Sequence, residues 1–311
     1  MVPTETSERL ATSAAYLQRP RELQDWLNHY CYHPLAWRLA QWLAPLPVTP
    51  NMVSILGGCL VVMAGIFYVQ STSPAATLIG LLLHMSWHVA DGADGDLARL
   101  TRRSSPYGEM IDGLCDYASH AILYIMLGLA LQVQIGAIAW LPTLAAGFSR
   151  IAQANYYEVQ RRQYQWWAHG VPWLRQSGQE RSDDAPRTLL ARMGQAYLAL
   201  AARLSPDPRR VDCALTEAEA GAAIPPGQLA PIRDLVRHHA RCLLPPTPLL
   251  GANWRTIMLG LSMLAGSPLY YFLYEALILN GLLAISVLRS KRQVQALERK
   301  IDQFASARMA R

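Results

Sequence analysis

The sequence predicts an all-α polytopic membrane protein with six transmembrane helices, an N-terminal interfacial helix and a helical cytoplasmic insertion. Composition and charge placement lead to this fold class. Of the 311 residues, 52% are hydrophobic and 16% are charged, whereas about 25% of residues in a soluble domain are charged. Lys and Arg are absent from residues 51–98, 104–149 and 256–288. Because a soluble fold spreads its bases over every element, this segregation indicates helices buried in lipid.

Each base-free stretch can hold two helices joined by a short turn, because about 20 apolar residues cross the hydrocarbon layer. The turns are predicted at 70–74, 132–134 and 266–268, where polar residues, Gly or Pro interrupt the apolar runs. The predicted spans are 51–70, 75–99, 106–131, 136–157, 254–267 and 270–289.

The basic residues gather at the helix ends opposite to these turns, as at Arg99, Arg102 and Arg103. The positive-inside rule therefore predicts a multi-pass protein of the cell inner membrane, with both termini and the basic loops in the cytoplasm. A net charge of +6 carried beside membrane helices suits an anionic lipid surface rather than a nucleic acid.

The predicted spans divide the chain into five segments. These are a cytoplasmic tail with an interfacial helix (1–50), spans one to four (51–157), a cytoplasmic helical insertion (158–250), spans five and six (251–290) and a cytoplasmic tail (291–311). Within the insertion, the apolar periodicity predicts helices at 188–204 and 229–243.

Two amphipathic patterns flank the spans. The first places Leu35, Leu39, Trp42 and Leu43 on one helical face. It favours a helix in the headgroup region, with a soluble packing helix as the alternative. The second repeats at a spacing of three to four residues and indicates a coiled-coil seam or a stripe on the membrane surface. Its members are Val294, Leu297, Ile301 and Phe304.

Four aspartates lie where the second predicted span ends and the third begins. Asp91 and Asp94 are three residues apart, and Asp112 and Asp116 are four apart, so each pair shares a helical face. The Ser-Pro dipeptide at 105–106 is typical of an N-cap followed by proline at the first helical position. The two helices are therefore predicted to be antiparallel neighbours whose acidic faces converge at the membrane boundary.

Clustered carboxylates repel one another and are costly near hydrocarbon, and a pair of divalent cations removes both problems. Hard oxygen ligands favour Mg²⁺ or Mn²⁺, and a two-metal site clamps the attacking and leaving oxygens of a phosphoryl transfer. Gly95 and Gly108 allow a nucleotide to approach the backbone closely. Arg99 offers a forked cation for a phosphate.

Two simpler explanations of the acids are weaker. A single aspartate at a helix end is most often a cap or a partner for a nearby arginine, but four at these spacings favour a metal site. A calcium-binding loop at 91–96 does not fit, because Ala93 and Gly95 stand where ligands are needed and no Glu occupies the twelfth position.

Residues 91–116 match the signature D-x2-D-G-x2-A-R-x8-G-x3-D-x3-D at all eight fixed positions, and in this the chain resembles the CDP-alcohol phosphotransferase family. Residues 49–51 (Thr-Pro-Asn) are similar to the family's entry to its first span. The resemblance implies six membrane helices, a homodimer, and a site open to the cytoplasm. It also implies transfer of a phosphatidyl or other phospho-alcohol group in phospholipid biosynthesis.

The resemblance also implies a role for each matched residue. Asp91, Asp94, Asp112 and Asp116 would bind two Mg²⁺ or Mn²⁺ ions, and the CDP pocket would consist of Gly95, Ala98, Arg99 and Gly108. Asp116 would also take the proton of the acceptor hydroxyl, which attacks the β-phosphorus of the CDP-alcohol so that CMP leaves.

The signature does not specify the acceptor, which we expect to be a small polar alcohol. His84, His88 and His120 continue the acidic faces and are candidates for the acceptor pocket, with hydrogen bonds between helices as the alternative. Arg150 and Arg255 are candidates for gripping an acceptor phosphate, such as that of inositol phosphate or glycerol phosphate. Snorkelling to the headgroups is the alternative for both.

The donor is predicted to be a CDP-activated lipid such as CDP-diacylglycerol, because a site at the membrane boundary leaves the lipid tail in the bilayer. Two other function classes stay open: a membrane CDP-lipid hydrolase with water as the acceptor, and a non-enzymatic membrane scaffold or transporter. Glu275, inside the sixth predicted span, is expected to pair with a neighbouring helix or to mark the dimer contact.

Overall fold

The structure is a computed structural model, and it describes residues 20–70, 73–171, 209–220, 229–238 and 250–309. In these ranges the chain is helical, with turns between the helices and no strand. The predicted all-α class is therefore confirmed. The predicted helix at 188–204 and the end of the one at 229–243 lie outside the described residues.

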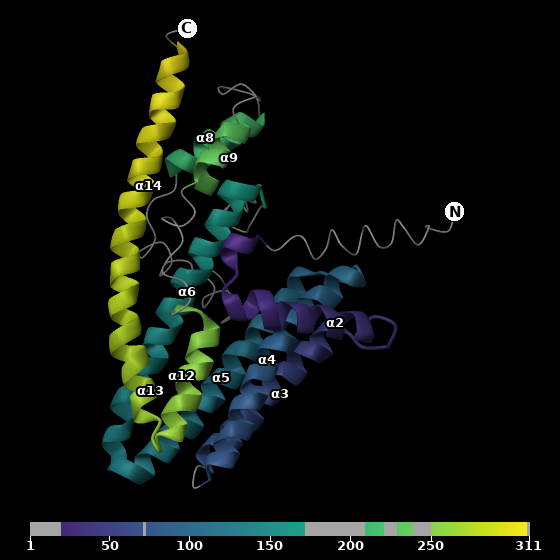
Figure 1. Cartoon of the computed structure of the whole chain (residues 1–311), viewed down its shortest axis with the longest axis vertical. Coiled ribbons are helices and arrows are strands. Elements are labelled where there is room, and N and C mark those ends of the chain that lie inside the picture. Colours follow the sequence, from purple (N-terminus) through teal and green to yellow (C-terminus); the bar gives the residue numbers. More distant parts are fainter. Residues whose placement is uncertain (1–19, 71–72, 172–208, 221–228, 239–249, 310–311) are drawn as a thin grey trace, which may run out of the picture. The chain divides into compact units, whose positions relative to one another are not determined.

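The chain forms two compact units, and Figure 1 labels the helices of each. Residues 1–148 and 252–276 make up the first unit, and residues 149–251 and 277–311 the second. From the N-terminus, the elements are η1 (Arg21–Leu23), the π-helix η2 (Asn28–Tyr32), α2 (His33–Leu43), α3 (Pro50–Val69), α4 (Pro74–Leu100), α5 (Pro106–Ile135), η3 (Gly136–Ala139), α6 (Trp140–His169), α8 (Arg209–Ala220), α9 (Leu229–His238), α12 (Ala252–Leu264), α13 (Leu269–Leu273), the π-helix η5 (Tyr274–Ile278) and α14 (Leu279–Met309).

Among the described residues, three helical stretches are long and apolar enough to cross a membrane: Pro50–Val69, Met110–His169 and Leu269–Ile301. This confirms the membrane character of the chain, while the number of six spans stays a prediction. α4 carries several acids in its last third, and α12 has only 13 residues. α12 is therefore too short to count as a span by length, and α4 is not among the three stretches.

Glycines let α3 pack closely against both α4 and α5. A Cβ atom added at Gly57 would lie 3.3 Å from the Trp87 ring on α4. One added at Gly58 would lie 3.6 Å from the carbonyl oxygen of Cys115 on α5. Small residues at such crossings let membrane helices approach backbone to backbone. α3 thus holds together the two helices that carry the aspartates.

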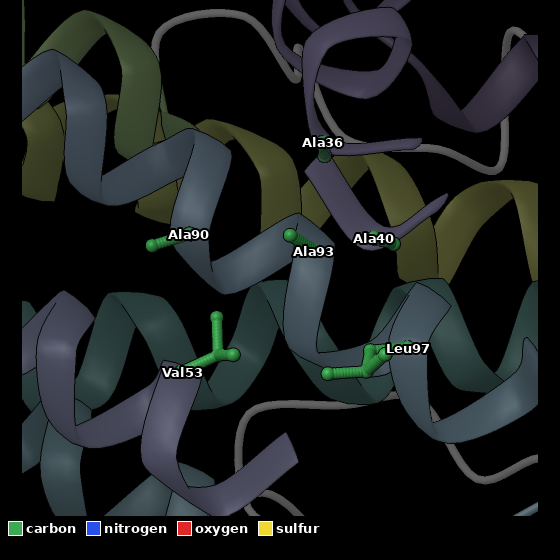
Figure 2. Close-up of a cluster of buried hydrophobic side chains, with 6 residues drawn as sticks. All are labelled: Ala36, Ala40, Val53, Ala90, Ala93 and Leu97. Atoms are coloured by element: carbon green, nitrogen blue, oxygen red, sulfur yellow. The ribbon is translucent and has the colours of Figure 1, made fainter. Parts of the chain in front are cut away.

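A small apolar cluster fixes α2 against the ends of α3 and α4, and Figure 2 shows its side chains converging. Its members are Ala36, Ala40, Val53, Ala90, Ala93 and Leu97. Leu39 and Leu43 pack against this cluster, whereas Leu35 and Trp42 are exposed, Trp42 to 82%. The face predicted to enter the headgroup region therefore has two parts. Leu39 and Leu43 pack against α3 and α4, and Leu35 and Trp42 stay exposed.

The connection from α4 to α5 is a closed turn with two caps. Arg103 N–H donates to the Ala98 carbonyl oxygen at 2.9 Å and Arg102 N–H to that of Arg99 at 3.3 Å. Arg102 has φ 54°, which completes a Schellman cap normally built on glycine. Ser105 accepts from Gly108 N–H at 3.0 Å and opens α5 with Pro106 behind it, as predicted.

The last turn of α5 contacts the turn that follows α12. Gln134 donates through Nε2 to the Gly266 carbonyl oxygen at 3.0 Å and accepts from Ser267 Oγ at 2.6 Å. The turn predicted at 132–134 is wrong in position, because α5 continues to Ile135 and the chain turns at Gly136–Ala139, whereas the turn predicted at 266–268 is confirmed.

Side-chain amides join α6 and α14 in the second unit. Asn280 donates to Ser149 Oγ and accepts from Gln153 Nε2, both at 2.8 Å, and Ser290 donates to Gln160 Oε1 at 2.9 Å. Gln153, Gln160 and Ser290 are buried, so their polar groups need partners within the protein.

The stripe predicted on α14 has a different role from either expectation. Val294, Leu297 and Ile301 are buried within the second unit, and α14 contacts α8. Val211 and Leu215 of α8 are buried as well. The stripe is therefore an internal packing face, a use that sequence spacing does not distinguish from a coiled-coil seam.

Candidate metal and nucleotide site

The carboxylates of α4 and α5 converge as predicted. One oxygen from each of Asp91, Asp112 and Asp116 lies within 4.8 Å of the other two. Asp94 adjoins this group, because its carboxyl lies against that of Asp112 while Asp91 lies against Asp116. Two antiparallel helices with acids at spacings of three and four thus form one acidic site.

Two uncharged side chains, one on α3 and one on α4, donate hydrogen bonds to these acids. Ser54 of α3 donates through Oγ to Asp94 Oδ2 at 2.6 Å, and both residues are buried. Trp87 of α4 donates through Nε1 to Asp116 Oδ1 at 2.9 Å. Neither donor carries charge, so the two bonds orient the carboxylates without neutralising them.

The residues expected in the CDP pocket lie beside the acids. Arg99 forms an ion pair with Asp96, whose side chain is buried, while about a third of the Arg99 side chain is exposed. A Cβ atom added at Gly95 would lie 3.6 Å from the Arg99 guanidinium group. At Gly108 it would lie 3.6 Å from Asn51 Oδ1. The face that carries Gly95 and Arg99 is therefore continuous with the acidic site, and nucleotide binding there stays a prediction.

The three candidate histidines form one aromatic cluster with Trp87. The ring centroids of His84 and His120 are 5.7 Å apart, and those of His84 and His88 are 6.4 Å apart. Trp87 lies 4.5 Å from His88 and 4.6 Å from His120. Tyr32 stacks on His88 at 4.9 Å and closes the cluster from the N-terminal side.

The hydrogen bonds of these histidines favour a structural role for at least two of them. His88 Nε2 bonds Thr256 Oγ1 of α12 at 2.9 Å, which ties two helices together. His120 Nδ1 lies 2.8 Å from the Asp116 carbonyl oxygen, so it carries the proton and donates. Hydrogen bonding between helices was the alternative to an acceptor pocket, and His88 makes such a bond. The predicted acceptor role is not tested by these contacts.

Arg255 lies in a buried ion pair. Its Nη1 atom is 3.4 Å from Glu275 Oε2, and the two side chains are exposed to only 4% and 0%. Tyr271 donates to Glu275 Oε1 at 2.7 Å, and Tyr124 bonds the Tyr271 hydroxyl at 3.1 Å. Glu275 thus pairs with a neighbouring helix, one of the two expectations. Arg150 belongs to the second unit, and its part in an acceptor pocket stays a prediction.

The donor set fits a hard divalent cation. The atoms that converge are carboxylate oxygens, which Mg²⁺ and Mn²⁺ prefer, and no sulfur or imidazole ligand is in the group. Asp91, Asp112 and Asp116 could ligate an ion together, and Asp94 is placed to share it. The identity and the number of the ions stay predictions.

Sequence reasoning missed several supporting residues. Ser54, Trp87 and Thr256 reach their partners from 40, 29 and 168 positions away. Trp87 lies one helical turn before Asp91, and this spacing is the signal by which it could have been found. Asp96 was considered only as part of a calcium loop, although its spacing of three from Arg99 is typical of a helical ion pair.

The fold and the site define a class: an all-α membrane protein with an acidic metal-type site between two adjacent helices. Residues 47–175 match the family model described as CDP-alcohol phosphatidyltransferase. This stretch holds α3, α4 and α5, so the family resemblance predicted from the motif is confirmed over the part of the chain that builds the site.

Curated relatives match about a third of the chain. Cholinephosphotransferase 1 of Gallus gallus is 32% identical over 122 residues, which is 37% of this chain and 34% of that protein. Archaetidylinositol phosphate synthase of Pyrococcus horikoshii is 34% identical over 104 residues, 33% of this chain and 50% of that protein. Cholinephosphotransferase 1 of Xenopus laevis is 33% identical over 111 residues, 33% of this chain and 26% of that protein. The chain thus spans half or less of the length of these relatives.

Proposed function

We propose that this protein is a membrane transferase for substituted phosphate groups in phospholipid biosynthesis. It moves a phosphatidyl or other phospho-alcohol group from CDP-diacylglycerol or a similar CDP-alcohol to the hydroxyl of a polar alcohol, and it releases CMP. The observation that carries this proposal is the convergence of Asp91, Asp112 and Asp116 within 4.8 Å across α4 and α5.

Each side chain of the site has a role in this reaction. Asp91, Asp94, Asp112 and Asp116 would hold the divalent cations, which would neutralise the diphosphate and polarise the phosphorus–oxygen bonds. The acceptor hydroxyl attacks the β-phosphorus, and the bond from that phosphorus to the bridging oxygen breaks, so that CMP leaves with that oxygen. Asp116 takes the hydroxyl proton as general base. Arg99, held by Asp96, presents its guanidinium group to the CDP phosphates from the exposed end of α4.

The relatives differ in the chemistry that their names state. One name specifies transfer of phosphocholine, and the other specifies synthesis of an inositol phosphate lipid. Both are compatible with one site for a CDP-alcohol and a variable site for the acceptor. We place a phosphorylated acceptor first because Arg150 and Arg255 are candidates for its phosphate, although Glu275 already pairs with Arg255.

The topology and assembly are also proposed. The Schellman turn exposes Arg102 and Arg103 at the end of α4, beside the acids. By the positive-inside rule this end, the site and both termini lie in the cytoplasm, with the spans in the inner membrane. We also propose a homodimer, which the resemblance implies.

The orientation is tested with a cysteine placed at Arg103 and a membrane-impermeant maleimide. We expect no labelling of this cysteine in intact cells and labelling after lysis.

The function is tested by CMP release from purified full-length protein with Mg²⁺ or Mn²⁺. CDP-diacylglycerol is offered with inositol phosphate, glycerol phosphate, serine, inositol or no alcohol, and CDP-choline is offered with diacylglycerol in a separate arm. We expect release that depends on one acceptor and falls at least a hundredfold in Asp116→Asn, because loss of a general base typically costs 10²- to 10⁴-fold. Asp234→Asn is the matched control, since Asp234 is an exposed acid on α9 that pairs with Arg237.

Release of CMP without any alcohol would instead support the CDP-lipid hydrolase, which shares the acids and differs only in the acceptor. A wild-type protein that releases no CMP in any arm, but keeps its fold and binds Mn²⁺, would contradict the transferase and favour a non-enzymatic role.

A further inference from the structure

The indole of Trp87 lies between the acidic site and the histidine cluster and contacts both. Its Nε1–H donates to Asp116 Oδ1 at 2.9 Å, and only 5% of the residue is exposed. A buried indole N–H usually finds a partner. Here the partner is one oxygen of the carboxylate proposed as general base, rather than a backbone carbonyl of the surrounding helices.

Close neighbours on three sides hold the ring in place. A Cβ atom added at Gly57 would lie 3.3 Å from Trp87 Cδ1, so α3 leaves no room for the ring to shift in that direction. His88 lies 4.5 Å from the indole, and His120 meets it edge to face at 4.6 Å. The donor of the hydrogen bond is therefore fixed by packing and does not depend on the bond itself.

Asp116 is thus held at two places by the same cluster. His120 Nδ1 donates to its backbone carbonyl oxygen at 2.8 Å, and Trp87 holds its side-chain oxygen Oδ1. An ionised carboxylate has about four acceptor positions. One donor on Oδ1 restricts the rotation of the group, and the indole itself does not occupy Oδ2.

We propose that Trp87 is a positioning residue that orients the Asp116 carboxylate for proton transfer. The inference rests on the proposed function, because it assigns Asp116 the proton. An indole N–H donates only and does not titrate, so Trp87 can hold Asp116 without competing for that proton. A histidine or tyrosine at the same position would add a second proton acceptor to the site.

The first test separates the hydrogen bond from the ring. Trp87→Phe keeps an aromatic ring against Gly57 and removes the N–H. We expect kcat for CMP release to fall about tenfold, in line with the 10- to 100-fold effect of supporting hydrogen bonds around metal ligands. KM for the CDP-alcohol should stay within about twofold, because Gly95 and Arg99 of the predicted nucleotide pocket lie more than two helical turns beyond Trp87 on α4.

Tyr32→Phe is the matched control. Tyr32 stacks on His88 in the same cluster, and its buried hydroxyl has no hydrogen-bond partner among the described residues. Burial raises the pKa of Tyr32 to about 12, so the hydroxyl is neutral at working pH and its removal changes no charge. The control should keep kcat within twofold of the wild type.

A second readout does not need activity. In ¹⁵N-tryptophan-labelled protein, the Trp87 indole cross-peak is assigned by its loss in Trp87→Phe. We expect its proton to move upfield in Asp116→Asn by clearly more than in Asp94→Asn, which removes a charge from the same site but bonds Ser54 instead of the indole. If Trp87→Phe does not fold, site-specific benzothienylalanine keeps both rings and replaces only the N–H by sulfur.

The outcomes are distinct. A tenfold loss of kcat at unchanged KM, together with the selective indole shift, supports the proposal. Equal kcat values in Trp87→Phe and Tyr32→Phe, or an indole proton that responds equally to both aspartate variants, would overturn it. A wild-type protein without transferase activity contradicts the proposed function alone, because the indole resonance still reports whether Trp87 bonds Asp116.

Discussion

Ser54 on α3 donates a hydrogen bond of 2.6 Å to Asp94 on α4, although the two residues are 40 positions apart. Both are buried, so the bond forms where no water competes for the carboxylate. Hydrogen bonds to an ionised acceptor are short and about twice as strong as neutral ones. α3 thereby orients one of the four carboxylates of the acidic site, whose aspartates lie on α4 and α5.

Removal of the Ser54 hydroxyl should lower the metal affinity of the site more than it lowers the stability of the fold. We expect Ser54→Ala to raise the Mg²⁺ or Mn²⁺ concentration needed for half-maximal CMP release about tenfold, since loss of a supporting hydrogen bond costs 10- to 100-fold in metal affinity or activity. Ser86→Ala is the control, because the exposed Ser86 donates to the Leu82 carbonyl oxygen of its own helix. An identical metal dependence in both variants would contradict a role for Ser54 in the site.

The turn between α4 and α5 carries a residue in an unfavourable backbone conformation. Arg102 has φ 54°, and the left-handed region costs about 1–2 kcal/mol for a residue with a Cβ atom. Arg102→Gly removes this cost but adds about 0.4–1 kcal/mol of chain entropy in the unfolded state. We expect a net gain of about 0.5–1 kcal/mol, measured as a higher midpoint of thermal unfolding in detergent.

Arg103→Gly provides the comparison for that prediction. It removes the same charge from the next position, whose φ is not positive, so only the entropic cost remains. The midpoint should fall in Arg103→Gly and rise in Arg102→Gly. Equal shifts in the two variants would mean that charge, and not backbone conformation, determines the effect.

The sequence predicted what depends on spacing within one helix. The acids at 91, 94, 112 and 116 fall on shared faces because an α-helix repeats every 3.6 residues, and the Ser-Pro dipeptide at 105–106 predicted the cap that opens α5. These local rules were sufficient for the all-α class and for the convergence of the four carboxylates.

Contacts between distant helices could not be predicted in this way. The bonds from Ser54 to Asp94 and from His88 to Thr256 depend on helix crossings that close-packed glycines set. The α14 stripe could not be assigned either, because packing against a neighbouring helix and dimerisation require the same 3–4 spacing. Periodicity identifies the apolar face, but it does not identify what covers that face.

The ion pair of Arg255 and Glu275 should show strong coupling in stability measurements. Both side chains are buried in the first unit, and Tyr271 adds a bond of 2.7 Å to the carboxylate. Glu275→Ala leaves Arg255 buried without this counter-charge, and loss of one partner of a buried pair costs about 3–5 kcal/mol. We expect a large fall in the unfolding midpoint for Glu275→Ala and for Arg255→Ala.

The double variant Arg255→Met/Glu275→Leu tests the origin of that cost. Hydrophobic replacement of a whole buried pair is often neutral or stabilising, so the double variant should be more stable than either single variant. Additive losses would show that the two charges do not act as a pair. Stability near the wild type with strongly reduced acceptor-dependent CMP release would assign Arg255 a part in substrate binding.

The last prediction concerns Asn280, which joins α14 to α6 by bonds of 2.8 Å to Gln153 and Ser149. Asn280→Leu removes both bonds and leaves the buried Gln153 amide without this acceptor. Interhelical hydrogen bonds in membranes contribute about 0.6–1.7 kcal/mol each, so we expect a loss of about 1–3 kcal/mol, measured by thermal unfolding in detergent. Ser286→Ala is the control, because its hydroxyl donates to the Leu282 carbonyl oxygen within α14. A midpoint for Asn280→Leu equal to that of the control would mean that the two bonds of Asn280 do not help to hold the two helices together.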